Sequence, residues 1–150
     1  PMGLEDNQFA WWTYFDHVAV QASLPWDVGL LAQWMDGFTA WGRYRNGVYS
    51  VDNRFRSNYV LLTRPFDRHR VTARYDHFEL TEADTTPLDE NSEQGHAWTV
   101  AYRYAATDNV TLAAEWLQIH TNRPAWAYFE LEESQTERQV QLSLQLRFGD

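Results

Sequence analysis

The chain has 150 residues, no cysteine and a formal net charge of −9. Disulfides and thiolate metal sites are therefore excluded, and the acidic charge argues against a nucleic-acid partner. Aromatic residues make up 16% of the chain, and the mean hydropathy is −0.59. No run approaches the roughly 18 apolar residues of a transmembrane helix, but a transmembrane β-strand needs only about 9–11 residues, half of them polar. We expect a single domain over residues 1–150.

Six segments alternate between apolar and polar residues, as strands do, and a seventh, 58–64, is a short apolar run. The pattern leaves the register of the third segment unfixed, and it loses phase within the sixth at Leu117 to Ile119. No segment has a helical period. The sequence therefore predicts an all-β chain with strands at 12–24, 28–36, 58–64, 70–80, 97–104, 110–120 and 139–148.

Short and long connections alternate along the chain. Turn residues predict tight turns at 25–27, 65–69 and 107–109, whereas 37–57, 81–95 and 121–137 are expected to be long connections. In an antiparallel up-and-down sheet, this places every short turn at one end and every long loop at the other. Transmembrane β-barrels have this asymmetry, with short periplasmic turns and longer extracellular loops.

Seven strands leave the N-terminus on the side of the long loops and the sheet unclosed. An open sheet edge in hydrocarbon would leave backbone groups unsatisfied, at a cost of several kcal/mol each. We therefore expect an antiparallel up-and-down transmembrane β-barrel, of which this chain is a fragment: about seven strands, the C-terminal part of a larger, porin-sized barrel.

The last segment, Gln139 to Phe148, has one apolar and one polar side. It resembles the C-terminal assembly signal of outer-membrane barrels, in which a polar residue, a small residue and spaced apolar residues lead to an aromatic one. Gln141, Ser143, Leu146 and Phe148 occupy those positions, although Ser143 replaces the usual Gly and two residues follow Phe148. The resemblance implies recognition of Gln139–Phe148 by the barrel assembly machinery.

Several segments are similar to the C-terminal region of phosphate-selective (O/P-type) porins. They are Tyr59-Val-Leu-Leu-Thr, Arg70-Val-Thr-Ala-Arg-Tyr-Asp-His-Phe, His96-Ala-Trp-Thr-Val-Ala-Tyr-Arg-Tyr and Leu112-Ala-Ala-Glu-Trp-Leu. The resemblance implies a homotrimeric channel in the bacterial outer membrane, in contact with lipid and lipopolysaccharide. Such a channel passes small hydrophilic solutes, anions included, by passive diffusion.

Charged and amide side chains share the polar side of the predicted strands. A charge at the lipid midplane costs about 2–4 kcal/mol for Arg, so these residues are expected to face the lumen. There they would set solute selectivity; alternatively they form cross-strand ion pairs that stiffen the wall, such as Arg103 with Glu115. The candidate pore-lining residues are Arg74, Asp76, Arg103, Glu115, Gln141, Gln145 and Arg147.

The expected connection 37–57 is rich in arginine and aromatic residues. Such a loop could clamp an anion or a lipopolysaccharide phosphate, or it could simply pack on its own aromatics. The candidate contacts are Arg43, Arg45, Arg54 and Arg56.

Neither catalysis nor cofactor binding is indicated. There is no G-x-S-x-G motif, no carboxylate pair is fixed for glycoside chemistry, and the five histidines have no metal-ligand spacing. We expect no enzyme activity, no cofactor and no metal. The alternatives are a soluble, lipocalin-like β-barrel or a carbohydrate-binding β-module that binds a small ligand.

Overall fold

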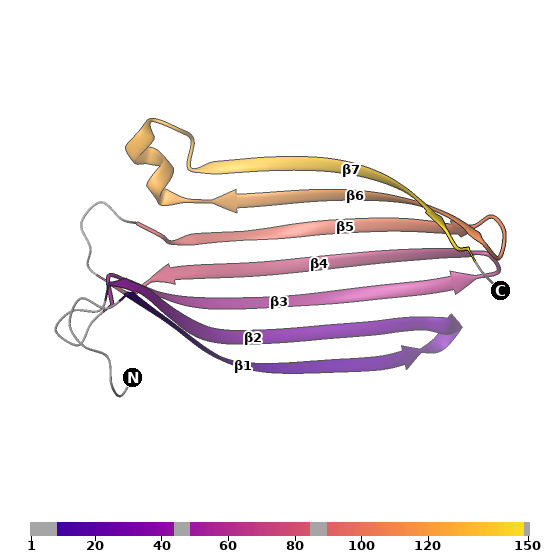
Figure 1. The fold of residues 1–150 in the computed structure, drawn as a ribbon, viewed down its shortest axis with the longest axis horizontal. Coiled ribbons are helices and arrows are strands. Elements are labelled where there is room, and N and C mark those ends of the chain that lie inside the picture. The colour runs from indigo at the N-terminus through magenta and orange to yellow at the C-terminus, as the bar shows by residue number, and fades with distance from the viewer. Residues whose placement is uncertain (1–8, 44–48, 85–89, 149–150) are drawn as a thin grey trace.

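The computed structural model describes residues 9–43, 49–84 and 90–148, which form one open antiparallel sheet (Figure 1). Its seven strands lie side by side in chain order, so the predicted all-β, up-and-down topology is confirmed. The two outer strands do not pair with each other, and the sheet is not closed. The strands are β1 Phe9–Leu24, β2 Val28–Arg43, β3 Val51–Phe66, β4 His69–Glu82, β5 Glu93–Ala105, β6 Val110–Asn122 and β7 Ser134–Leu146.

The strands are longer than the alternation predicts, and most of the added residues lie at the end of the sheet where the long connections are expected. The prediction of a connection over 37–57 is wrong, because β2 continues to Arg43 and β3 begins at Val51. Backbone pairing holds these segments in the sheet although their side chains no longer alternate. β6 likewise continues through Leu117 and Ile119 in unbroken register. The third connection contains a 3-10 helix, η2, at Pro124–Phe129.

The predicted separation of short and long connections is confirmed. Three tight turns lie at one end of the sheet, and β7 ends there too (Figure 1). The β1–β2 turn is a 3-10 turn, η1 Pro25–Asp27, and the β3–β4 turn consists of Asp67 and Arg68. Asp67 has a φ of 51°, a left-handed conformation that aspartate tolerates better than most residues. We call this the turn end, and the opposite one the loop end.

Because side chains alternate, the register assigns every strand residue to one of two faces. One cross-strand row on what we call the apolar face is Ala22, Leu30, Leu62, Ala73, Val100, Trp116 and Val140. The neighbouring row, on what we call the polar face, is Ser23, Gly29, Thr63, Thr72, Ala101, Glu115 and Gln141. The register that was unfixed in 58–64 therefore puts Val60 and Leu62 on the apolar face.

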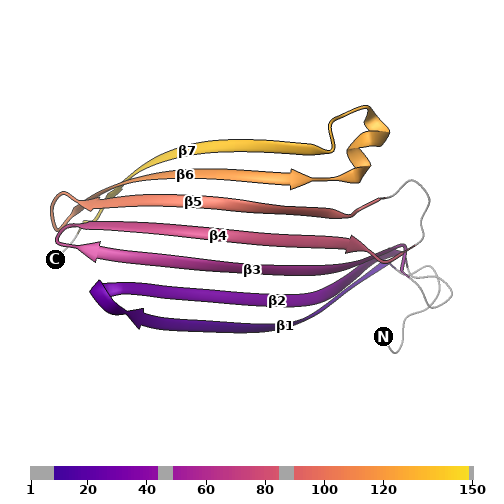
Figure 2. The same cartoon turned by 180° about the vertical axis from the view of Figure 1, so that it is seen from behind.

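In the described residues, neither face is covered by a helix or by a second sheet (Figures 1 and 2). Large apolar side chains consequently stay exposed: Leu142 is 77% exposed, Val140 69% and Val18 61%. Among the described residues only Ala40, Gly42, Val51, Asn53, Gly95 and Ala97 are buried. A single layer with an uncovered apolar face has no core of its own.

Candidate functional site

A band of apolar side chains crosses the apolar face, and aromatic residues mark its edge on the side of the loop end. We call Trp34 on β2, Tyr75 on β4, Trp98 on β5 and Trp116 on β6 the aromatic belt. Tyr75 and Trp98 are direct cross-strand partners with ring centroids 4.7 Å apart.

The belt does not follow the hydrogen-bonded rows of the sheet. The row that starts at Trp34 reaches β6 at His120, four residues from Trp116. Four residues along a strand span about 13 Å and four strand spacings about 19 Å, so the belt crosses the rows at about 35°. The hydrogen-bonded rows run perpendicular to the strands. If the belt marks a flat boundary, the strands are therefore inclined by about 35° to the normal of that boundary. Transmembrane barrel strands are tilted by about 35–45°.

A second group of aromatic rings edges the band at the turn end. Phe66, His69 and Tyr104 come from β3, β4 and β5 and stack, with ring centroids 5.3 Å apart for the first pair and 4.8 Å for the second. The Tyr102 hydroxyl lies 2.6 Å from His69 Nδ1. The apolar band therefore has amphipathic aromatic residues along both edges.

Beyond the belt, towards the loop end, the apolar face carries both aromatic and charged residues. Trp12 and Phe38 pack edge to face there, with ring centroids 5.1 Å apart. Asp36 and Arg56 are cross-strand partners that form an ion pair of 2.9 Å. The prediction that these arginines lie in a loop is wrong, because Arg54 and Arg56 lie on β3 and Arg43 is the last residue of β2. Arg45 lies outside the described residues.

The candidate pore-lining residues on strands share the polar face, as the register requires. Arg147 follows the last residue of β7, and its backbone N–H donates to the Asn109 carbonyl at 2.9 Å. Arg74 donates to Asp76 with its Nε at 2.9 Å, and its guanidinium lies 4.1 Å from the Tyr59 ring centroid. This arginine is fixed in place by its neighbours.

Two other arginines on the polar face are placed differently. Arg70 and Arg103 are direct cross-strand partners near the turn end. With Arg68 they line a shallow hollow of about 230 Å³, and neither Arg70 nor Arg103 forms an ion pair with any described residue. Like charges directly opposite each other destabilise a sheet. The predicted pairing of Arg103 with Glu115 is not formed; Glu115 lies opposite Ala101 and Gln141.

Aromatic residues gather on the polar face of β1 and β2 at the loop end. Phe9, Trp11, Thr39 and Trp41 line an apolar hollow of about 420 Å³. The Trp11 indole N–H donates to Thr39 Oγ1 at 3.0 Å, and 76% of Trp11 is exposed.

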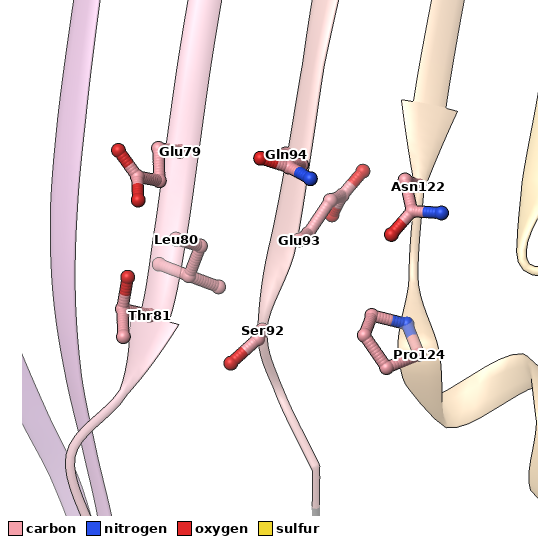
Figure 3. A pocket seen from close by; sticks show the side chains of 8 residues that line it. All are labelled: Glu79, Leu80, Thr81, Ser92, Glu93, Gln94, Asn122 and Pro124. Carbon is pink, nitrogen blue, oxygen red and sulfur yellow. The ribbon is translucent and has the colours of Figure 1, made fainter.

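The acidic residues of the loop end do not converge on a common point. Figure 3 shows a hollow of about 130 Å³ between β4, β5 and β6, in which Glu79 points towards β3 and Glu93 towards Asn122. Glu93 is ion-paired with Arg123 at 2.8 Å. Within the described ranges, no three or more His, Cys, Asp or Glu side chains are grouped as a metal site requires.

No family model, curated protein or solved structure matches the chain. In the described part of the chain, no helix has the length and hydropathy needed to cross a membrane. The assignment of function therefore depends on the geometry of the sheet itself.

Proposed function

We propose that the seven strands are part of a transmembrane β-barrel in the bacterial outer membrane, and that the barrel is a porin-like channel for small hydrophilic solutes. The observation that carries this proposal is the apolar band, edged by aromatic residues and inclined to the hydrogen-bonded rows at about 35°. A soluble core needs no such planar boundary, because its limits follow the packing of a second layer.

The two open edges support the same proposal. β1 and β7 each pair on one side only, and in hydrocarbon an unpaired strand edge costs several kcal/mol per backbone group. Further strands that close the sheet would remove both edges. The polar face then becomes the wall of a water-filled lumen, as in porins.

Passive diffusion through such a lumen depends on its width and on the charges of its wall. Arg70 and Arg103 favour anions, because the structure places two positive charges opposite each other with no ion-pairing carboxylate among the described residues. A diffusing anion would reduce their mutual repulsion. Arg74 contributes less to this field, because Asp76 neutralises it.

Charge reversal at this pair tests the channel function. In the full-length protein reconstituted in planar bilayers, Arg70→Glu with Arg103→Glu should lower the anion-over-cation permeability ratio several-fold, measured as the reversal potential in a salt gradient. Arg138→Glu, on the apolar face, serves as the control, because it changes a charge that does not face the lumen.

The control should leave the reversal potential almost unchanged. An inserted double variant that conducts with the same reversal potential as the original protein would contradict the role of the arginine pair. A protein that inserts but never conducts would contradict the channel proposal as a whole.

A further inference from the structure

Three histidines that are far apart in the sequence form a row on the apolar face. His77 on β4 lies directly opposite His96 on β5, which lies directly opposite His120 on β6. The His96 and His120 rings are 5.3 Å apart between centroids. His120 Nδ1 lies 3.0 Å from Thr136 Oγ1 on β7. We call these three residues the histidine row.

The row lies just beyond the aromatic belt, on the side of the loop end. His77 and His96 are two residues beyond Tyr75 and Trp98, and His120 is four residues beyond Trp116. The inference therefore rests on the proposed function: if the band lies in hydrocarbon, belt residues lie at the interface and the row lies at the depth of the lipid headgroups.

The charges that face the row from the neighbouring strands are few. β4 contributes Glu79 and β7 contributes Arg138, whose Nε donates to Gln118 Oε1 at 3.0 Å. Arg56 on β3 is held by Asp36. The other side chains around the row are uncharged: Asn58, Tyr75, Gln94, Trp98, Gln118, Asn122, Ser134 and Thr136.

We propose that the histidine row, when protonated, binds the phosphate groups of anionic lipid headgroups and releases them as the pH rises. Imidazoles take up protons near pH 6.5 in model peptides. Three protonated rings side by side repel one another. A phosphate held across them offsets that repulsion with charge-assisted hydrogen bonds.

The sign of the pH dependence follows from linkage. Phosphate binding favours the protonated rings, so the contact is complete at acidic pH and is lost as the pH rises through neutrality. Arg138 keeps its charge throughout, so a weaker attraction for anionic lipid remains when the rings are neutral.

The test measures which lipids the protein collects around it. The full-length protein is reconstituted in phosphatidylcholine vesicles, and electron paramagnetic resonance compares the binding of spin-labelled phosphatidylglycerol and phosphatidylcholine in its first lipid shell. The preference for phosphatidylglycerol should rise several-fold between about pH 8 and about pH 5.5, which bracket histidine protonation.

Variants locate the effect. The triple variant His77→Gln, His96→Gln, His120→Gln should lose the rise at acidic pH, and His96→Gln alone should lose part of it and serves if the triple variant fails to fold. His17→Gln is the matched control, because His17 lies on the polar face of β1, and it should keep the full rise.

Each of the following outcomes would contradict the proposal. An inserted protein with no rise at acidic pH, or variants of the row that keep it in full, would overturn the proposal and leave the channel function standing. Binding of inorganic phosphate at acidic pH without any preference for phosphatidylglycerol would show a free-anion site and overturn the assignment to lipid. Absence of any motionally restricted lipid would show that the protein does not insert, and the proposed function would fail with the row.

Discussion

Two glycines on the polar face differ in how much space the neighbouring strands leave for a side chain. Gly95 on β5 lies opposite Phe78 on β4, and a Cβ at Gly95 would approach the Phe78 ring to 2.6 Å and also crowd the His120 carbonyl oxygen. At Gly29 the nearest atom to such a Cβ would be the Thr63 methyl group, at 3.1 Å. The two positions differ in the space available and share the same face.

Gly95→Ala should therefore destabilise the sheet by about 1–3 kcal/mol, because the added methyl group meets backbone and a ring that the sheet holds in place. Gly29→Ala is the matched control and should be neutral or slightly stabilising, since Ala loses less conformational entropy than Gly. Urea unfolding of both variants in detergent micelles measures the difference. Equal stability of the two variants would contradict the tight fit at Gly95.

At the scale of the element, β7 presents its two faces most plainly. Leu142 is 77% exposed on the apolar face, and Gln141 stands beside it on the polar face. On a sheet surrounded by water, arginine at an exposed position would cost little. Opposite lipid it costs about 2–4 kcal/mol near the midplane.

Leu142→Arg should therefore lower the stability of the inserted protein by about that amount, whereas Gln141→Arg should change it little. Reversible urea unfolding in lipid vesicles provides the measurement. Equal effects of the two substitutions would show that the faces of β7 do not differ in their surroundings.

The strands themselves were predictable from alternation, as in Val18 to Leu24 and Val140 to Leu146, because a half-buried strand must repeat every two residues. The last strand was predicted to reach Phe148, but β7 ends at Leu146. The strand ends were not predictable. Gly37 and Phe55, for example, belong to the sheet through backbone pairing, which the side-chain pattern does not record.

The shared face of the candidate pore-lining residues was predictable, since alternation fixes the side within each strand. Contacts between strands were not. The Arg70–Arg103 pair and the histidine row depend on the register between strands. That register changes when a turn is longer or shorter by a single residue.

At the scale of the whole molecule, seven strands form one layer with an uncovered apolar face, two open edges and almost no buried side chains among the described residues. Water is a poor solvent for such a surface, because exposed apolar patches on soluble monomers rarely exceed a few hundred Å². Hydrocarbon against the apolar face and water against the polar face satisfy both sides at once.

The most direct test of this account is a spin-label scan along β7 of the full-length protein in lipid vesicles. This chain has no cysteine, so it adds no competing labelling site to a single introduced cysteine between Arg138 and Leu146. Lipid-facing labels collide with oxygen, which concentrates in hydrocarbon, and water-facing labels collide with a polar nickel chelate. The account predicts that labels at Val140, Leu142 and Leu144 respond to oxygen, whereas those at Gln139, Gln141, Ser143 and Gln145 respond to the chelate. Labels on the apolar positions that respond to neither reagent would show a buried protein core and contradict it.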